Sequence, residues 1–261
     1  MKKKLLLSLP VELPTELEGL LSGGKIYDSS CSPEARVYFI DKDDGYYLKR
    51  AERGALFKEA QMTKYFYSIG LGAKVLYYIS GKYDLLLTAR MRGEDCTHKR
   101  YLDNPLWLCD TIADALRRLH EHNTDGCPIA NRTADYITAV EENYSAGRYD
   151  MSLFSDRIVF GSPDEAIRVF RDGADALMSD TLLHGDYCLP NIMLDGNRLS
   201  GFIDVGNGGV GDRHIDIFWG IWTLWYNLKT DKYSSRFLDV YGRDKADKEL
   251  LRVIAAAEIF G

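Results

Sequence analysis

Residues 184–191 read HGDYCLPN, and residues 203–206 read IDVG. The first stretch places a carboxylate, Asp186, five residues before an amide, Asn191, and the second stretch adds the carboxylate of Asp204. Phosphoryl transfer needs a group that takes or orients a hydroxyl proton, and oxygen ligands for the magnesium on a triphosphate. We expect Asp186 to supply the first of these, and Asn191 and Asp204 to supply the second. Polar turns that cap a sheet are the alternative.

The same order of residues occurs in the kinase catalytic loop H-R-D-x-x-x-x-N and its later D-F-G. This chain lacks D-F-G and a recognisable A-P-E segment, which disfavours a protein kinase. It also lacks a Walker A motif and a G-x-G-x-x-G loop. The small polar segment 29–33, which contains Ser32, is the candidate for a loop that covers phosphates with backbone N–H groups, and an ordinary loop is the alternative.

Lys49 and Tyr47 are two residues apart in a strand-like stretch and therefore share one face. We expect Lys49 to hold the α- and β-phosphates and Tyr47 to stack against the adenine. Glu59 follows on a predicted helix, where it shares a face with apolar residues, namely Leu56, Met62 and Phe66. A carboxylate on an apolar stripe is costly unless it is paired, which predicts a Lys49–Glu59 ion pair. A solvent-facing lysine and a glutamate at the edge of the stripe are the alternatives.

The first third of the chain alternates like an antiparallel sheet. Strands are predicted at 36–40, 46–49, 75–79 and 83–88, with a turn at 43–45 and a helix from about 53 to 68. After about Gly93 the pattern becomes helical. Asn104-Pro105 and the capping box Ser162-Pro163-Asp164-Glu165 both indicate helix starts. Short strands are predicted near Leu182, Ile192 and Phe202, and a buried helix at 215–228.

These patterns predict an α+β fold with two lobes, a small antiparallel-sheet lobe and a larger, mainly helical lobe. We expect a nucleotide-binding lobe at 1–88, a hinge at 89–94 and a catalytic and substrate-binding lobe at 95–261. Residues 1–94 contain 15 basic and 12 acidic residues, whereas residues 95–261 contain 18 basic and 27 acidic residues. The net charges are therefore +3 and −9, which suits an anion on the first lobe and a cation on the second. A solvated acidic surface is the alternative.

The composition excludes several classes of protein. The chain has 261 residues and a net charge of −6, which gives no electrostatic case for binding nucleic acid. Its five cysteines form no C-x-x-C pair, as expected for reduced thiols in a cytoplasmic protein. The apolar stretch after Met1 is too short for a signal peptide, and the apolar run at 215–228 is too short and too interrupted to span a bilayer.

The sequence resembles the aminoglycoside phosphotransferases, especially those that act on the 3′-hydroxyl. The resemblance runs nearly end to end, with gaps in the middle. Two features that point narrowly to this family are the run CLPNIM at 188–193 and the ending Glu258-Ile259-Phe260. Further matching pieces are YYLK at 46–49, SGFID at 200–204, Asp212-Arg213 and Asp216-Ile217.

The resemblance implies a bilobed, protein-kinase-like fold and direct transfer of the ATP γ-phosphate to a drug hydroxyl, with Mg²⁺. Asp186 matches the catalytic aspartate of the family, Asn191 and Asp204 its metal ligands, and Lys49 and Glu59 its phosphate-binding lysine and helix partner. The segment from Thr88 through Arg90 and Met91 to Gly93 matches the hinge whose backbone reads the adenine. Glu258 and Phe260 match the end that contacts the drug, Glu258 through an ammonium group.

The chain departs from the family pattern around the expected drug pocket. The family often has an arginine where this chain has Asn207, a residue that we also place in the substrate site. Two acidic substrate residues of the family align with Tyr226 and Asn227, and Gly261 extends the usual ending by one residue. Tryptophans crowd the same helix at a spacing of three, at Trp219, Trp222 and Trp225, which favours core packing over a platform for a sugar.

We therefore expect a cytoplasmic aminoglycoside 3′-phosphotransferase that confers antibiotic resistance. Its expected partners are the nucleotide and a small cationic antibiotic, with no nucleic acid, membrane or obligate protein partner. One alternative is a kinase for another hydroxylated small molecule, such as another antibiotic or choline. A second is a catalytically silent nucleotide-binding protein. The sequence leaves open the preferred drug, the choice between ATP and GTP, and the oligomeric state.

Overall fold

The computed structural model describes residues 4–31, 35–152 and 160–261. These residues form two compact units. The first contains the chain up to Gly93 together with Ser200–Gly206, and the second contains Glu94–Leu199 and Asn207–Gly261. Residues 200–206, which the sequence pattern assigns to the second lobe, thus group with the first unit.

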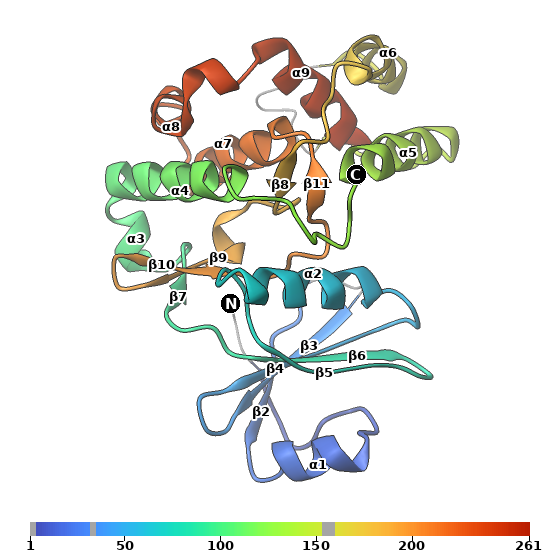
Figure 1. Cartoon of the computed structure of the whole chain (residues 1–261), viewed down its shortest axis with the longest axis vertical. Coiled ribbons are helices and arrows are strands. Elements are labelled where there is room, and N and C mark those ends of the chain that lie inside the picture. Colours follow the sequence, from blue (N-terminus) through green and yellow to red (C-terminus); the bar gives the residue numbers. More distant parts are fainter. Residues whose placement is uncertain (1–3, 32–34, 153–159) are drawn as a thin grey trace. The chain divides into compact units, whose positions relative to one another are not determined.

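The first unit is built on an antiparallel sheet with the strand order β1-β2-β3-β4-β6-β5 (Figure 1). Its strands are β1 (Lys4–Leu6), β2 (Lys25–Asp28), β3 (Ala35–Asp41), β4 (Tyr46–Ala51), β5 (Val75–Ser80) and β6 (Asp84–Ala89). The four predicted strands correspond to β3, β4, β5 and β6, whereas β1 and β2 were not predicted. The β3–β4 turn depends on Gly45, which has φ +95° and whose Cβ, if present, would lie 2.9 Å from the Phe39 ring.

Helices α1 (Thr15–Leu21) and α2 (Phe57–Ser68) cover opposite faces of this sheet (Figure 1). Leu85 and Leu87 of β6 pack in the same apolar cluster as α1 residues, whereas Leu86 packs with the cluster that includes Ala60 of α2. This division follows from the alternation of side chains along a strand. The sheet is therefore buried on both faces.

Helix α2 begins at Phe57, four residues later than predicted. The carboxylate of Asp84 accepts hydrogen bonds from the backbone N–H groups of Gly54 and Leu56, both at 2.9 Å. These bonds cap the turn at residues 54–56, and Gly54, with φ +87°, lies outside helical geometry, so the helix begins after it. The helix ends before Gly70, which has φ +76°.

The second unit is mainly helical (Figure 1). Its helices are α3 (Lys99–Leu102), α4 (Pro105–His120), α5 (Arg132–Ser145), α6 (Pro163–Ala174), α7 (His214–Leu228), α8 (Ser234–Tyr241) and α9 (Lys248–Ala257). Short strands β7 (Glu94–Asp95) and β9 (Ile192–Asp195) pair antiparallel, as do β8 (Thr181–Leu183) and β11 (Gly209–Gly211). Strand β10 (Arg198–Phe202) carries the chain into the first unit. The predicted α+β class is confirmed.

The helix-start predictions hold, with one difference. Pro105 is the first residue of α4, and the Ser162 hydroxyl accepts a hydrogen bond from the Glu165 N–H at the start of α6. The Glu165 carboxylate, however, accepts from the N–H of Gly161 and not from that of Ser162. The second hydrogen bond of the capping box, to the Glu165 carboxylate, therefore comes from the residue before the one that the motif predicts.

One apolar cluster of the second unit is formed by α5, α6, α7 and α9 with Leu183 of strand β8. Small residues allow close helix packing. A Cβ at Gly173 of α6 would lie 2.3 Å from Val253 of α9, and a Cβ at Gly220 of α7 would lie 2.6 Å from the Phe237 ring of α8. The predicted buried helix at 215–228 is thus α7. No helix within the described ranges is long and apolar enough to cross a membrane.

Candidate active site

In the first unit, Lys49 contacts two carboxylates. Its Nζ lies 2.7 Å from Glu59 Oε2 and 2.9 Å from Asp204 Oδ1. Lys49 extends from β4, Glu59 from α2, and Asp204 from the returning segment 200–206. The side chains of Lys49 and Glu59 are 20% and 13% exposed, whereas that of Asp204 is 53% exposed. The predicted Lys49–Glu59 pair is therefore present.

The electrostatics of this group favour a charged lysine. Burial acts to lower the pKa of Lys49, but the charges of Glu59 and Asp204 and their hydrogen bonds outweigh burial and raise it. Burial raises the pKa of Glu59, and Lys49 acts in the opposite direction. Lys49 is thus held as a cation that can bind an anion, with Asp204 on its more exposed side.

Two glycines let the segment 200–206 approach the rest of the first unit closely. A Cβ at Gly201 would lie 2.6 Å from the Leu71 carbonyl oxygen, and a Cβ at Gly206 would lie 3.1 Å from Glu59 Cβ. The N–H of Phe202 donates to the same Leu71 carbonyl at 2.8 Å. Asp204 itself has φ +58°, in the left-handed region that aspartate tolerates better than most residues. This backbone places its carboxylate on Lys49.

The other nucleotide candidates lie on or near the β4–β6 ladder. Tyr47 is opposite Thr88 in the register of these strands, and its ring packs at 5.1 Å from that of Phe39. The N–H of Arg90 donates to the Gly45 carbonyl. Met91 contacts the Cα side of Gly201, since a Cβ there would lie 2.6 Å from Met91 Cε. Ser32 lies outside the described residues.

In the second unit, Asp186 and Asn191 lie in a tight loop after β8. The Asn191 Nδ2 donates to Asp186 Oδ2 at 2.8 Å and to the Asp186 carbonyl at 3.0 Å. The loop closes through a 3₁₀ turn at Leu189–Asn191. The Cys188 side chain also hydrogen-bonds to the Asp186 carboxylate. Because the Asn191 bonds use its Nδ2, the oxygen Oδ1 of its amide is the atom through which Asn191 could bind a metal.

This loop is anchored by Asp216 of α7, a fully buried carboxylate. Its oxygens accept from the N–H groups of His184 at 2.7 Å and Gly185 at 2.8 Å. The His120 Nε2 lies 3.1 Å from Asp216 Oδ2, and its Nδ1 lies 2.8 Å from the Tyr241 hydroxyl. Burial lowers the pKa of His120 more than Asp216 raises it, so the ring is neutral and donates through Nε2.

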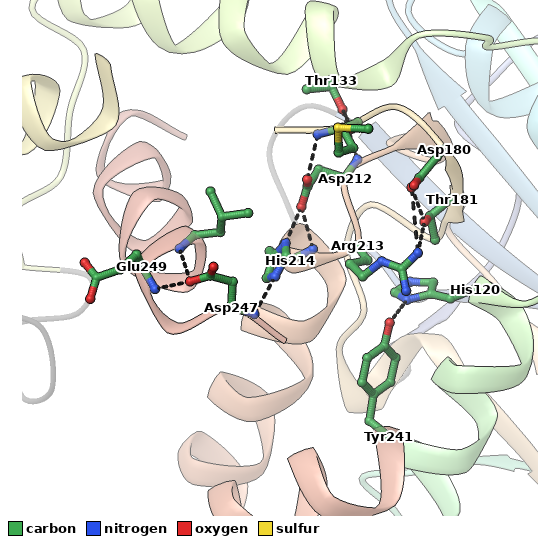
Figure 2. Close-up of polar contacts among 12 residues, drawn as sticks. His120, Thr133, Asp180, Thr181, Asp212, Arg213, His214, Tyr241, Asp247 and Glu249 are labelled. Atoms are coloured by element: carbon green, nitrogen blue, oxygen red, sulfur yellow. Dashed lines mark hydrogen bonds and ion pairs between the residues drawn. The ribbon is translucent and has the colours of Figure 1, made fainter. Parts of the chain in front are cut away.

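A second buried carboxylate, Asp212, connects the start of α7 to α9 (Figure 2). It accepts from the Met178 N–H at 2.8 Å and from His214 Nδ1 at 2.7 Å. The His214 Nε2 accepts from the N–H of Asp247, the N-cap residue of α9. Burial acts to raise the pKa of Asp212, but the hydrogen bonds from His214 and Met178 lower it. These hydrogen bonds therefore stabilise the charged form of the buried Asp212 carboxylate in place of water.

Sequence reasoning assigned no role to Asp216, His120 or Asp212. A signal was present for Asp216, because a carboxylate inside the apolar run of α7 must find donors. His120 ends the apolar stripe of α4 and carried no comparable signal. Its partners become apparent only when α4 and α7 are packed together.

Asn207 lies against the loop of Asp186 through its backbone. Its carbonyl oxygen accepts from Arg132 Nε at 2.8 Å. A Cβ at Gly185 would lie 1.9 Å from the same oxygen, so only glycine fits there. Gly185 also has φ +83°, which favours glycine independently.

Glu258 and Phe260 belong to the short 3₁₀ helix after α9 and are both buried. The Tyr136 hydroxyl donates to Glu258 Oε1 at 2.8 Å, and the Trp219 side chain also donates to this carboxylate. Burial raises the pKa of Glu258 to about 7, against the opposing effects of these hydrogen bonds. The ring of Phe260 packs edge-on against Tyr144, 5.7 Å between centroids.

Two of the three tryptophans of α7, Trp219 and Trp222, pack against the core as predicted. Trp219 and Trp222 contact the apolar core of the second unit and each other, with ring centroids 5.2 Å apart. Tyr226 stacks on Trp222 at 4.8 Å, and Lys229 Nζ lies 4.3 Å from the Tyr226 ring centre. Asn227 donates to the Thr223 carbonyl of its own helix.

The sequence is similar to known phosphotransferases. Residues 33–253 match the model of the phosphotransferase enzyme family. The chain is 47% identical over 251 residues to a Lactococcus lactis protein named "Probable aminoglycoside 3′-phosphotransferase", covering 96% of this chain and 95% of that protein.

Two solved structures show the same fold. An aminoglycoside-3′-phosphotransferase of type VIII superposes with a TM-score of 0.76 at 22% identity, over 94% of this chain and 97% of the other. A Streptomyces rimosus aminoglycoside phosphotransferase in complex with ADP and streptomycin superposes with a TM-score of 0.69 at 21% identity, over 85% of this chain and 90% of the other. The chain belongs to the phosphotransferase enzyme family and, within it, to the aminoglycoside 3′-phosphotransferases.

Proposed function

We propose that this enzyme transfers the γ-phosphoryl group of ATP to the 3′-hydroxyl of an aminoglycoside and thereby confers resistance. The observation that carries the proposal is the Lys49 ammonium between Glu59 and Asp204, a cation held beside an exposed carboxylate. The 47% identical relative supports the acceptor class, and the ADP-bound structural neighbour supports the nucleotide. Because ATP is a cytoplasmic metabolite, the proposal includes a cytoplasmic location.

The proposed roles divide between the two parts of the chain. Residues 1–88 bind the nucleotide, residues 89–94 form the hinge, and residues 95–261 bind the acceptor and carry the catalytic loop. Lys49 binds the α- and β-phosphates, and Glu59 keeps its ammonium in place. Tyr47 stacks on the adenine, while the backbone from Thr88 through Arg90 and Met91 reads its edge.

Asp186 is the group that receives the acceptor proton. Asn191 donates to its Oδ2 at 2.8 Å and so holds the carboxylate in place for the hydroxyl. The hydroxyl oxygen forms a bond to the γ-phosphorus as the bond from that phosphorus to the β,γ-bridging oxygen breaks. ADP leaves with the electron pair of that bond, and the hydroxyl proton goes to Asp186.

The residues present suit Mg²⁺. Among the described residues, no cluster of three or more His, Cys, Asp or Glu side chains forms a complete cage for a metal. Asn191 and Asp204 offer one amide and one carboxylate oxygen, which fits an ion that binds few protein oxygens and otherwise water and phosphate oxygens. The chemistry that Mg²⁺ supplies when bound is neutralisation of the phosphate charge. Because the Nδ2 of Asn191 donates to Asp186, the Oδ1 of the same amide is the atom that would bind Mg²⁺.

The acceptor side carries negative charge. Glu258 is ionised above a pH of about 7 and then attracts an ammonium group of the drug. Asn207 and Phe260 complete the proposed acceptor site. One observation favours a second candidate, a kinase for a less cationic hydroxylated compound. Lys229 places a positive charge on the ring of Tyr226. Tyr226 and Asn227 align with two acidic substrate residues of the family.

ATP turnover by the purified enzyme tests these alternatives. The acceptors are aminoglycosides matched in pairs, with and without the 3′-hydroxyl, together with choline, and GTP replaces ATP in a parallel series. Turnover only with drugs that carry the 3′-hydroxyl supports the proposal. Equal turnover of the 3′-deoxy partners would mean that the phosphate goes to a hydroxyl other than the 3′ one. Turnover of choline alone would favour the second candidate.

A further inference from the structure

Helix α5 contacts both parts of the proposed acceptor site through one face. Arg132 and Tyr136 are four residues apart and therefore lie one above the other on the helix. The Arg132 Nε donates to the Asn207 carbonyl at 2.8 Å, and the Tyr136 hydroxyl donates to Glu258 at 2.8 Å. The guanidinium carbon lies 5.7 Å from the centre of the Tyr136 ring, within the range of a cation–π contact.

The Asn207 carbonyl connects Arg132 to the catalytic loop. This oxygen is packed so closely on Gly185 that a Cβ there would lie 1.9 Å away. Gly185 immediately precedes Asp186, and its N–H is held on Asp216 at 2.8 Å. The loop is therefore fixed by Asp216 and by the Asn207 carbonyl. A shift of that carbonyl must move Gly185, because no space separates the two.

The charged groups around Glu258 come from three elements. Burial raises its pKa to about 7, and the Asp186 charge acts in the same direction. Arg132 acts against both, as do the hydrogen bonds from Tyr136 and Trp219. Burial, with a smaller contribution from the Glu258 charge, raises the pKa of the Cys188 thiol so far that the thiol stays neutral. Arg132 is thus the cation that favours ionised Glu258.

We propose that Arg132 is a positioning residue that couples the two parts of the acceptor site. It fixes Asp186 through the Asn207 carbonyl and Gly185. Because it lies over the ring of Tyr136, whose hydroxyl donates to Glu258, it also favours the negatively charged form of Glu258 for a cationic group of the acceptor. The second of these roles rests on the proposed function. The first concerns the catalytic loop alone and holds for any acceptor.

Two substitutions separate these roles. Arg132→Lys retains a positive charge but lacks the planar guanidinium that reaches Asn207. Arg132→Gln removes the charge as well. A small displacement of reacting groups can cost up to about a hundredfold in rate, so we expect kcat to fall roughly tenfold in both variants. KM for the acceptor near neutral pH should rise in Arg132→Gln alone and return toward the wild-type value at higher pH.

Arg171→Gln is the matched control. Arg171 also contacts α5, through Glu141 at 2.6 Å and 2.8 Å, but this pair is exposed and touches neither Asn207 nor Glu258. We expect wild-type kcat and KM from this variant. If both Arg132 variants match Arg171→Gln within twofold in kcat, the positioning role is wrong.

A measurement without acceptor tests the charge role separately. The carboxyl carbon of Glu258 can be followed by ¹³C NMR against pH and assigned by its absence in Glu258→Gln. The titration midpoint should move upward in Arg132→Gln and stay near the wild-type value in Arg132→Lys. An unchanged midpoint in Arg132→Gln would exclude the charge role.

These readouts also distinguish the inference from the proposed function. If the wild type phosphorylates no aminoglycoside, the proposed function fails, yet the Glu258 titration and the rate of ATP hydrolysis to water still report on Arg132. If Arg132→Gln loses its near-ultraviolet circular dichroism, kcat of the folded Arg132→Lys variant decides the positioning role.

Discussion

The two groups of site residues are held in different ways. In the first unit, Lys49, Glu59 and Asp204 hold one another by charge, and Asp204 is half exposed. In the second unit, the loop of Asp186 is held by backbone N–H groups on a carboxylate, Asp216, that is fully buried. An ion pair near solvent can rearrange when a ligand arrives, whereas backbone bonds to a buried carboxylate fix a position. The first arrangement suits binding of phosphates and the second suits orientation of a hydroxyl.

Removal of the Asp186 carboxylate is expected to have the largest effect. A positioned base contributes about 10²–10⁴ in rate, so Asp186→Ala should lower kcat by that factor while nucleotide affinity is retained. Steady-state kinetics and calorimetric nucleotide binding measure the two quantities. Asp172→Ala, at an exposed position on α6, is the control and should behave like the wild type. A loss confined to KM would remove Asp186 from the catalytic role.

Asp216→Asn tests whether the backbone hydrogen bonds to Asp216 fix the loop of Asp186. Asparagine has one acceptor oxygen, so either the His184 or the Gly185 N–H loses its partner. An unsatisfied buried donor costs about 1–3 kcal/mol, and loss of the loop position should lower kcat by up to roughly a hundredfold. Urea unfolding and kcat measure the two effects, with the exposed Asp239→Asn as control. A loss of stability without any loss of kcat would make Asp216 purely structural.

Substitutions in the first unit should act on nucleotide binding. Lys49→Met removes the phosphate-binding cation, and a charge-assisted bond is worth about 1.5–3 kcal/mol, which corresponds to a rise of roughly tenfold or more in KM for ATP. Glu59→Gln should cost less, since Lys49 still has Asp204. Lys64→Met, at an exposed position on the same helix as Glu59, is the control. Equal effects of Lys49→Met and Lys64→Met would contradict this account.

The pH dependence of Glu258 should give the smallest effect. Its pKa is raised to about 7 in the folded protein, above the ordinary glutamate value, so the carboxyl is neutral below that pH. KM for a cationic acceptor should therefore fall several-fold as pH rises through about 7, and Glu258→Gln should lose this dependence. The folded state binds the extra proton, so this group makes stability decrease as pH rises from the ordinary glutamate pKa to about 7. Glu249→Gln, exposed on α9, should retain both slopes.

The sequence predicted the elements whose pattern is local. Strands β3 to β6 are rich in aromatic and branched apolar residues, and the loop from Asp186 to Asn191 has a fixed spacing. Helix α2 starts later than its pattern indicates because Gly54 has φ +87°, which a right-handed helix does not allow, and its N–H is bound by the distant Asp84. Strands β1 and β2 were missed because β1 is short and β2 has little alternation.

The sequence predicted the Lys49–Glu59 contact but not the groups that hold the other candidate site residues in place. Lys49 and Glu59 were paired from a carboxylate on an apolar stripe, a local argument. The partners of Asp216 and Asp212 come from segments far away in sequence, so no spacing could indicate them. Glu258 was identified by resemblance, but its burial against Tyr136 depends on the packing of α5 beside the end of the chain. The role that we infer for Arg132 has the same origin.

The position of the phosphate in the product tests the central claim most directly. The wild-type enzyme is incubated with ATP, Mg²⁺ and an aminoglycoside that carries the 3′-hydroxyl, and the product is analysed by ¹H–³¹P correlation NMR. The account predicts a single phosphate on the 3′ oxygen, formed by the wild type and lost in Asp186→Ala. A phosphate on another oxygen, or equal product from Asp186→Ala, would contradict it.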